Sequence, residues 1–467
     1  MQITITSSFW MFLLIVMLAL QLLLILILVI KPILRYLVGL QIKDFLGKLL
    51  SDKYTQNLME IWPAGKRISV LNILEIGLRS QNGKIVTRPI GSPKKFPGFD
   101  NLMFSPRLMT RLSLPENAQI NMQVTIGPRA KKPMTLNIPI MIGAMAYGIA
   151  LSEEAKKALA RAAKTLQTST CSGEGPFLPE ERMEAGNYVL QISRWAWGAR
   201  TQEQIDSANM LEVQMGQGSD MGAVSIEAAE FEGRAQELSG LAPDEMAIAF
   251  PAPPGIQKQS DWPGFMKSLR KRSNGVPIAL KLMATGHLEE DLDAAIRLGF
   301  DAVIIDGAQG GSHATTPVKQ DDFGIPTLFA LIRAVRFLKK HGVREQMSLI
   351  IAGGFYTPGE CLKALALGAD AIYMATVPLF SLTHNQVSKV IPWEPPTTLV
   401  FYDSPSKSKL DIDQAATSVV NTITSMVLEM EEGMRALGKA SLKELNADDL
   451  VALDALSAEV TGVKRMY

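Results

Sequence analysis

The order of hydrophobic and polar positions divides the chain into an unbroken apolar run, a mixed stretch, and a long region of alternating apolar and amphipathic segments. Residues 9–30 are uncharged, and Gln21 is the one polar side chain among them. As a helix they would measure about 33 Å at about 1.5 Å per residue, enough to cross a hydrocarbon core of about 30 Å. The pattern therefore predicts a transmembrane helix within residues 1–31.

The flanks of this apolar run predict its orientation. A cleaved signal peptide is the alternative, but residues 1–8 hold no Lys or Arg and no small-residue cleavage site follows the run. Lys31, Arg35 and Lys43 come soon after it, so the positive-inside rule places the rest of the chain in the cytoplasm. We expect a single-pass membrane anchor with a cytoplasmic body.

Residues 32–136 carry a weaker pattern. Apolar and basic positions alternate at helical spacing over 33–50, which fits a helix on the membrane surface and equally an amphipathic helix packed on the body. Over 51–130, loop-like stretches at 93–99 and 114–120 separate short strands. We expect an irregular N-terminal extension that packs on the main domain.

From residue 137 onward, short apolar runs alternate with segments of helical periodicity, as in sheets of buried parallel strands. The strand-like runs lie at 137–145, 167–171, 188–193, 211–216, 277–283, 301–307, 348–354 and 370–376. The clearest helical patterns lie at 153–166, 288–299, 325–340 and 358–368. The order predicts an α/β fold with a (β/α)8 TIM barrel over residues 137–400, and a doubly wound open sheet is the alternative.

Two segments fall outside this repeating pattern. Residues 218–275 are too long for one strand-to-helix connection and indicate an insertion beside the strand ends. Residues 401–467 read as a C-terminal helical extension, with an amphipathic pattern at 411–438 and another helix opening at 441–450. We expect these helices to fold back over the barrel.

Composition then narrows the classes of function. The 467 residues include 47 Lys and Arg against 46 Asp and Glu, so we expect no nucleic-acid partner. Cys171 and Cys361 are too few for a thiolate zinc site, an iron–sulfur cluster or a disulfide scaffold. The 4 histidines are widely spaced along the chain, so we expect no metal site.

Small-residue turns follow the last three expected strands. Active sites of TIM barrels lie at the C-terminal ends of the strands, and a phosphate often binds after the seventh and eighth. Residues 306–312 follow the sixth strand, Gly353 and Gly354 the seventh, and Ala375 and Thr376 the eighth. Glycine lets backbone N–H groups approach an anion closely, so we expect a bound phosphate ester, with ordinary tight turns as the alternative.

Polar side chains near the strand ends supply candidate chemistry. Lys281 lies in an apolar strand, where it would stabilise a reduced flavin, form a Schiff base, or reach outward from the strand end. Glu174 lies between two glycines, where it meets a ligand or belongs to a solvated turn. Gln191 would bind a flavin edge or a substrate carboxylate, or be a satisfied core amide. His313 would act as a general base or shape the phosphate loop.

Six ordered motifs resemble the FMN-binding synthase domain of the glutamate synthase family, over about residues 139–376 and more weakly at 444–454. They read here GAMAYG, TCSGEG, QMGQGSDMG, LKL, QGGSHA and AGG, and they carry over Glu174, Gln217 and Lys281. The resemblance implies a TIM barrel whose cofactor is FMN. Reduced FMN would pass a hydride to 2-iminoglutarate, formed from 2-oxoglutarate and ammonia, and so give L-glutamate.

The same resemblance implies roles for individual residues. Glu174, Gln191 and Lys281 would form the catalytic group. The cofactor would be bound by Met145 and Ala146 against the ring, with Gln217 and Lys281 beside it. Its phosphate would be held by Gly310, Gly311, Ser312, Gly353, Gly354, Ala375 and Thr376.

Several departures from the family pattern leave the substrate open. Residues 378–390 contain no cysteine where the family binds an iron–sulfur cluster, and the amidotransferase domain has no counterpart. The family's arginine falls near residues 195–198, with only Arg194 close by, and two family lysines correspond to Gln214 and Asp220. These changes leave the expected fold and flavin in place, but they weaken the expectation of a dicarboxylate substrate.

Together these features predict a membrane-anchored FMN-dependent oxidoreductase acting on CH–NH2 donors, with a 2-oxo acid or amino acid as its small-molecule substrate. A protein that donates electrons or supplies ammonia is the expected partner. One alternative is a flavin-binding electron-transfer or supporting subunit of a membrane complex. Another is an FMN oxidoreductase acting on a different amine or 2-oxo acid. A 2-hydroxy acid oxidase fits less well, because its catalytic histidine–arginine pair has no clear counterpart.

Overall fold

The computed structural model describes residues 7–218, 221–222, 224–312 and 315–467. The chain forms two compact units, Met1–Val86 and Thr87–Tyr467, and each is described by itself. His313 and Asp220, both singled out in the sequence, lie outside the described residues.

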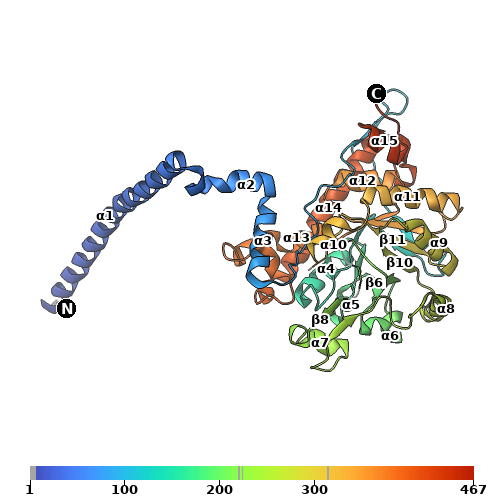
Figure 1. The fold of residues 1–467 in the computed structure, drawn as a ribbon, viewed down its shortest axis with the longest axis horizontal. Helices are drawn as coiled ribbons and strands as arrows, with labels where there is room; N and C mark the ends of the chain where they lie inside the picture. Colours follow the sequence, from blue (N-terminus) through green and yellow to red (C-terminus); the bar gives the residue numbers. More distant parts are fainter. Residues whose placement is uncertain (1–6, 219–220, 223, 313–314) are drawn as a thin grey trace, which may run out of the picture. The chain divides into compact units, whose positions relative to one another are not determined.

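The first unit is helical (Figure 1). Its longest element, α1 (Ser7–Ser51), runs through Pro32 without a break, so residues 33–50 continue the same helix. From Phe9 onward α1 is long and apolar enough to cross a membrane by length and composition, and its apolar side chains are exposed.

Residues 51–82 contain two further helices, so the prediction of irregular structure is wrong there. These are α2 (Ile61–Ile68) and α3 (Val70–Asn82). Ser69 separates them: its backbone turns to φ 72°, and its hydroxyl accepts a hydrogen bond from Asn72 N at the start of α3. Gly83 ends α3 in the left-handed conformation. The caps at Ser69 and Gly83 set the bounds of α3.

In the second unit, eight parallel strands of the described residues form one sheet in the order β4-β13-β12-β11-β10-β7-β6-β5. They are β4 (Ile140–Ile142), β5 (Ser169–Cys171), β6 (Asn187–Ile192), β7 (Met210–Gln214), β10 (Ile278–Met283), β11 (Ala302–Asp306), β12 (Ser348–Ala352) and β13 (Ala371–Met374). The first and last strands of the sheet meet where Thr168 Oγ1 donates to Ile140 O at 2.5 Å. This seam makes the sheet a nearly closed barrel, which confirms the TIM fold over the open sheet.

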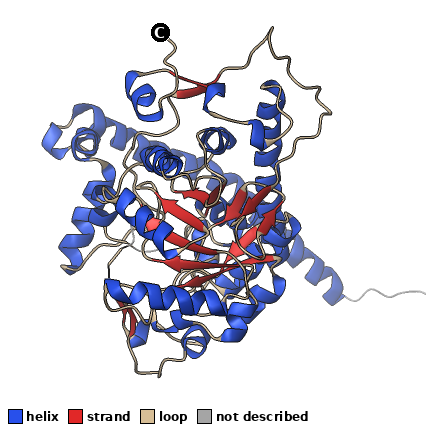
Figure 2. Ribbon diagram, turned by 90° about the vertical axis from the view of Figure 1, so that its right-hand side faces the viewer, coloured by secondary structure: helices blue, strands red, loops and turns tan. Residues whose placement is uncertain are grey.

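Helices surround the strands, as Figure 2 shows in blue around red. They are α4 (Glu153–Thr165), α5 (Pro179–Glu184), α6 (Gln202–Asp206), α8 (Trp262–Arg272), α9 (Leu288–Leu298), α10 (Pro317–Asp322), α11 (Thr327–Lys340), α12 (Pro358–Ala366) and α13 (Thr376–Thr383). Capping residues mark where these helices begin. Ser152 Oγ accepts from Ala155 N at the start of α4, and Thr357 and Glu360 form a capping box at the start of α12. The four helices expected most clearly from the pattern are confirmed.

The N-terminal end of the barrel is closed by a hairpin of β2 (Val124–Ile126) and β3 (Met134–Leu136). Ile126, Met134 and Leu136 join the apolar cluster that fills the barrel interior. Gly127 N donates to Ser348 Oγ at 3.0 Å, where β12 begins. Because this end is plugged, the C-terminal ends of the strands are left for ligands.

The insertion between β7 and β10 is shorter than expected. It contains β8 (Val224–Ile226), α7 (Arg234–Ser239) and β9 (Ala247–Ala249). The following α8 lies between β7 and β10 in the chain and is the barrel's own helix, so the insertion ends near residue 261 rather than 275.

The C-terminal extension packs on the barrel domain. The long helix α14 (Ile412–Ala436) packs on α4, and β14 (Leu450–Ala452) pairs with β1 (Leu102–Phe104). The helix expected at 441–450 is wrong: these residues form two 3-10 turns and the start of β14, and α15 (Ala455–Thr461) begins later. Asp449 is held there by an ion pair with Lys439, which favours the turn over a continuing helix.

Candidate active site at the C-terminal ends of the strands

The loops after β4 and β5 touch each other at the mouth of the barrel. Gly173 has φ +67°, and a Cβ there would lie 2.6 Å from the Met145 carbonyl carbon, so only glycine permits the contact. The next residue, Glu174, is half-buried. Its backbone oxygen accepts from Trp197 Nε1 at 2.7 Å, and its Oε2 accepts from Gln214 Nε2 at 3.3 Å. The structure therefore places Glu174 beside Met145 and Ala146.

A buried lysine beneath these loops escaped the sequence reasoning. Lys156 of α4 is fully buried, and its Nζ donates to Met145 O at 2.6 Å and to Cys171 O at 2.8 Å. It also forms an ion pair with Glu181 at 2.9 Å. Burial raises the pKa of Glu181, and Lys156 opposes this rise. The Lys156–Glu181 pair holds the backbone at Met145 in place. Nothing in the sequence indicated this role, because Lys156 is followed by Lys157 in an amphipathic helix.

The expected catalytic residues Gln191 and Lys281 meet inside the barrel through Glu212, which the sequence reasoning also missed. Gln191 Nε2 donates to Glu212 Oε1 at 2.6 Å, and Lys281 Nζ lies 3.9 Å from the same oxygen. Lys281 Nζ also donates to Gln217 Oε1 at 2.9 Å. The Tyr373 hydroxyl donates to Glu212 Oε2 at 2.9 Å. Met210, Glu212 and Gln214 are two residues apart along one strand, so their side chains share a face. An acid in this series was the signal by which the sequence could have indicated Glu212.

Gln191, Glu212, Lys281 and Tyr373 form a polar layer inside the barrel. Burial raises the pKa values of three groups in or beside it, Cys171, Tyr373 and Asp306. It raises the pKa of the Cys171 thiol to about 12, and the Glu212 carboxylate adds to the rise. It likewise raises the pKa of Tyr373 well above its ordinary value. Burial also raises the pKa of Asp306 at the end of β11, while the Lys281 charge lowers it. The neutral thiol and phenol can therefore act as hydrogen-bond donors at pH 7.

The turns after β11 and β12 form the expected glycine-rich edge. Gly353 and Gly354 have φ +102° and +76°, which favours glycine, and Gly307 N donates to Ala352 O at 3.0 Å. Gly310 packs so tightly that a Cβ would lie 2.3 Å from Asp306 Oδ1. The neighbouring strand β13 ends at Met374. Ala375 follows it beside Gly143, and α13 begins at Thr376.

Gly311 and Ser312 also contact an N-terminal segment. A Cβ on Gly311 would lie 2.0 Å from Ile90 O, and Ile90 N donates to Ser312 O at 3.0 Å. Arg88 pairs with Asp321 of α10 at 2.5 Å and anchors the same segment. Residues 88–92 therefore lie along the loop that follows β11, and they bring the N-terminal extension to the edge of the site.

The cationic side chains near the mouth bind protein groups. Arg194 is buried, with Nε donating to Gln214 Oε1 at 3.3 Å and Nη1 to Gly222 O at 2.7 Å. Arg200 is also buried and donates to Gln191 O and Gly175 O, both at 2.9 Å. Burial lowers the pKa of Arg200 to about 10, so it still carries its charge at pH 7.

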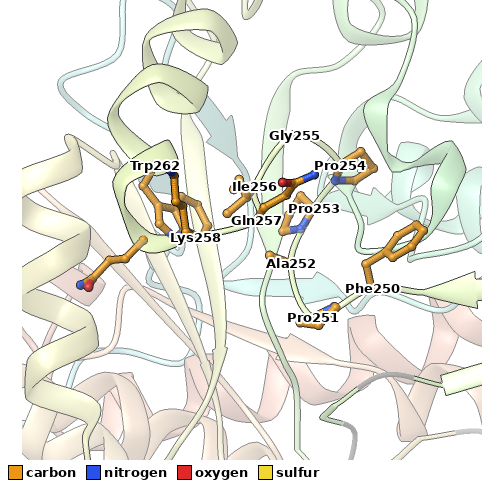
Figure 3. Close-up of a pocket in the computed structure, with 11 residues that line it drawn as sticks. Phe250, Pro251, Ala252, Pro253, Pro254, Gly255, Ile256, Gln257, Lys258 and Trp262 are labelled. Carbon is orange, nitrogen blue, oxygen red and sulfur yellow. The ribbon is translucent and has the colours of Figure 1, made fainter.

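A cavity of about 670 Å³ lies in the loop that follows β9. Figure 3 shows Phe250, the prolines and Trp262 around it. The loop joins the strand ends because Phe250 N donates to Arg194 O at 2.9 Å and Ala249 bridges Trp195. The insertion thus provides a mainly apolar hollow attached to the end of β6.

These residues fit a flavin mononucleotide. Lys281 offers a buried cation, and Gln191 Oε1 is a buried acceptor with no hydrogen-bond partner among the described residues. Positive-φ glycine turns end the seventh strand, and the eighth ends at the start of a helix, where backbone N–H groups can meet a phosphate. These groups match a planar, hydrogen-bonding ring with a phosphate tail.

A parallel (β/α)8 barrel with polar residues at its C-terminal end defines the class of protein as a TIM-barrel enzyme. Among solved structures, a mutant of flavocytochrome b2 with pyruvate bound has a similar fold, with a TM-score of 0.50 at 15% identity over 78% of this chain and 80% of that one.

The conserved region in glutamate synthase matches residues 98–440, and the chain belongs to this family of oxidoreductases. A glutamate synthase large subunit-like protein of Rhizobium meliloti is 30% identical over 84% of this chain and 92% of its own length. An archaeal-type glutamate synthase [NADPH] of Dehalococcoides mccartyi is 27% identical over 74% and 69%.

Proposed function

We propose that this protein is a membrane-anchored, FMN-dependent oxidoreductase that reduces an imine, such as 2-iminoglutarate, to the corresponding amino acid. The observation that carries the proposal is the polar layer of Gln191, Glu212 and Lys281 at the ligand end of a glutamate synthase-family barrel. When bound and reduced by an electron donor, FMN would supply the hydride that the imine carbon needs. The cofactor would be held by Met145, Ala146, Gln217, Lys281, Gly310, Gly311, Ser312, Gly353, Gly354, Ala375 and Thr376.

The side chains of this chain have separable tasks in such a reaction. The Lys281 ammonium stabilises negative charge at the edge of the ring, and Gln191 provides an amide acceptor inside the barrel. Glu174 is the carboxyl group at the mouth, positioned by Trp197 and Gln214. As a general acid, it would donate a proton to the substrate nitrogen when the hydride reaches the imine carbon.

The helix α1 would anchor the enzyme and leave the barrel in the cytoplasm. Its apolar length fits a bilayer, and Lys31, Arg35 and Lys43 follow its apolar part. A protein that remains in the membrane pellet after alkaline extraction, with the barrel digested by protease only in inverted vesicles, would support both statements. Release by alkali would refute the anchor.

Anaerobic single-turnover spectroscopy tests the reaction on the detergent-solubilised full-length protein. We expect a flavin spectrum and FMN on release, and reoxidation of the reduced protein only when 2-oxoglutarate and ammonium are both present. Glu174→Gln should slow this reoxidation by about 10²–10⁴-fold, the range for loss of a general acid. Glu203→Gln, on the exposed start of α6, is the matched control and should react as the wild type does.

Two other outcomes would change the assignment. FMN that stays reduced with both substrates would contradict 2-iminoglutarate and favour another imine or amine, or an electron-transfer subunit of a membrane complex. A protein that binds no FMN would refute the proposed function.

A further inference from the structure

A buried acid that the proposed reaction does not use lies at the centre of the polar layer. Glu212 is fully buried, and each of its carboxylate oxygens accepts a hydrogen bond, from Gln191 at 2.6 Å and from Tyr373 at 2.9 Å. A carboxylate out of water is costly unless charge and hydrogen bonds compensate it. An apolar side chain at this position would fill the barrel at lower cost.

The compensating charge is Lys281, whose side chain is almost completely buried with Glu212. The two charged atoms are 3.9 Å apart, and Lys281 Nζ also lies 5.5 Å from the centre of the Tyr373 ring. The pair is neutral as a whole. Lys281 therefore meets a ligand as one half of an ion pair and not as an unopposed cation.

The remaining titratable groups that face Glu212 among the described residues are Cys171, Tyr373 and Asp306. Cys171 Sγ lies 3.9 Å from Glu212 Oε2. Because burial raises the pKa of the thiol and the phenol, both stay neutral at pH 7. Burial raises the pKa of Asp306, which favours its neutral form. Glu212 and Lys281 form the ion pair of this layer.

We propose that Glu212 sets the reduction potential of the bound flavin by acting as the fixed counter-charge of Lys281, an inference that rests on the proposed function. Reduction adds two electrons and one proton to the ring and leaves one negative charge on it. Lys281 attracts this charge and Glu212 repels it, and both effects are stronger in a buried site than in water. Glu212 is a positioning residue, since it touches Lys281 and Gln191.

Equilibrium reduction of the full-length protein with dithionite and a reference dye measures the potential directly. Glu212→Gln keeps the size and an acceptor but removes the charge, so the potential should become more positive. Lys281→Met should make it more negative. Asp449→Asn is the matched control, because Asp449 is also buried and paired with a lysine but lies in the C-terminal extension. Its potential should equal that of the wild type.

The outcomes separate this inference from the proposed function. A Glu212→Gln protein with a full complement of FMN and an unchanged or more negative potential would overturn the inference and leave the function intact. If that variant binds no FMN, Tyr373→Phe replaces it: the carboxylate keeps its charge and loses a donor, so the potential should become more negative. An unchanged or more positive potential of Tyr373→Phe would equally overturn the inference. Absence of FMN from the wild type would refute the proposed function instead.

Discussion

Replacing Lys156 with methionine should destabilise the barrel far more than the same change at its neighbour. Lys156 is fully buried and pairs with the buried Glu181 at 2.9 Å, whereas Lys157 is partly exposed and pairs with Glu153 at 3.7 Å one turn away. Methionine is close to lysine in volume, so the cavity contribution is small. The comparison therefore isolates the loss of charge and of hydrogen bonds.

The magnitude follows from what the substitution leaves behind. Removing one partner of a buried ion pair costs about 3–5 kcal/mol, because the other charge stays uncompensated. Met145 O and Cys171 O also lose their ammonium donor. We expect Lys156→Met to lower the free energy of unfolding by about 3–5 kcal/mol. Lys157→Met should lower it by about 0.3–0.5 kcal/mol, as for exposed helical pairs.

Urea unfolding of the detergent-solubilised protein, followed by near-ultraviolet circular dichroism, measures the difference. The double variant Lys156→Met with Glu181→Gln should recover part of the loss, since no charge then remains buried alone. The reasoning would be refuted if Lys156→Met were no less stable than Lys157→Met. It would also fail if the double variant were less stable than Lys156→Met alone.

Three further predictions concern the mouth and the interior of the barrel. Gly175→Ala should abolish flavin binding, because its Cβ would lie 2.1 Å from Tyr147 O. Gly359→Ala is the control: its Cβ would have nothing within 4 Å, so this variant should bind flavin normally. The measurement is the ratio of flavin to protein in each purified variant. Cys171 should resist iodoacetamide at pH 8 until the protein unfolds, because burial raises the pKa of its thiol to about 12; mass spectrometry detects the adduct. Asp306→Asn should stabilise the protein increasingly above about pH 4, because the raised pKa makes the folded state bind this proton more tightly than the unfolded chain. An unfolding midpoint that differs from wild type by the same amount at pH 4 and pH 8 would contradict this.

The contact between residues 88–92 and the loop after β11 gives the site a physical link to the N-terminal part of its own unit. Arg88 exchanges backbone hydrogen bonds with Thr315 and forms an ion pair with Asp321. The phosphate-type turn is thus built from two segments far apart in the sequence. Within this turn, Gly311 is packed against Ile90.

The sequence by itself determined the order and the positions of the barrel elements. Buried parallel strands need near-continuous apolar runs, and the connecting turns need glycine and capping residues, so these signals are local and legible. They located all eight strands that the structure describes in the barrel, and they placed Lys281 and Gln191 on strands and Glu174 in a loop. They missed α2 and α3, whose boundaries depend on a single turn at Ser69.

Only the tertiary structure decided which polar groups meet. Glu212, Tyr373 and Lys281 come from three strands whose spacing in the sequence says nothing about their distance, and closure of the barrel brings them together. Lys156 likewise becomes a structural cation only because α4 packs over the ends of β4 and β5. A local pattern records whether a residue is polar, whereas the cost of burying its charge depends on partners that the fold supplies.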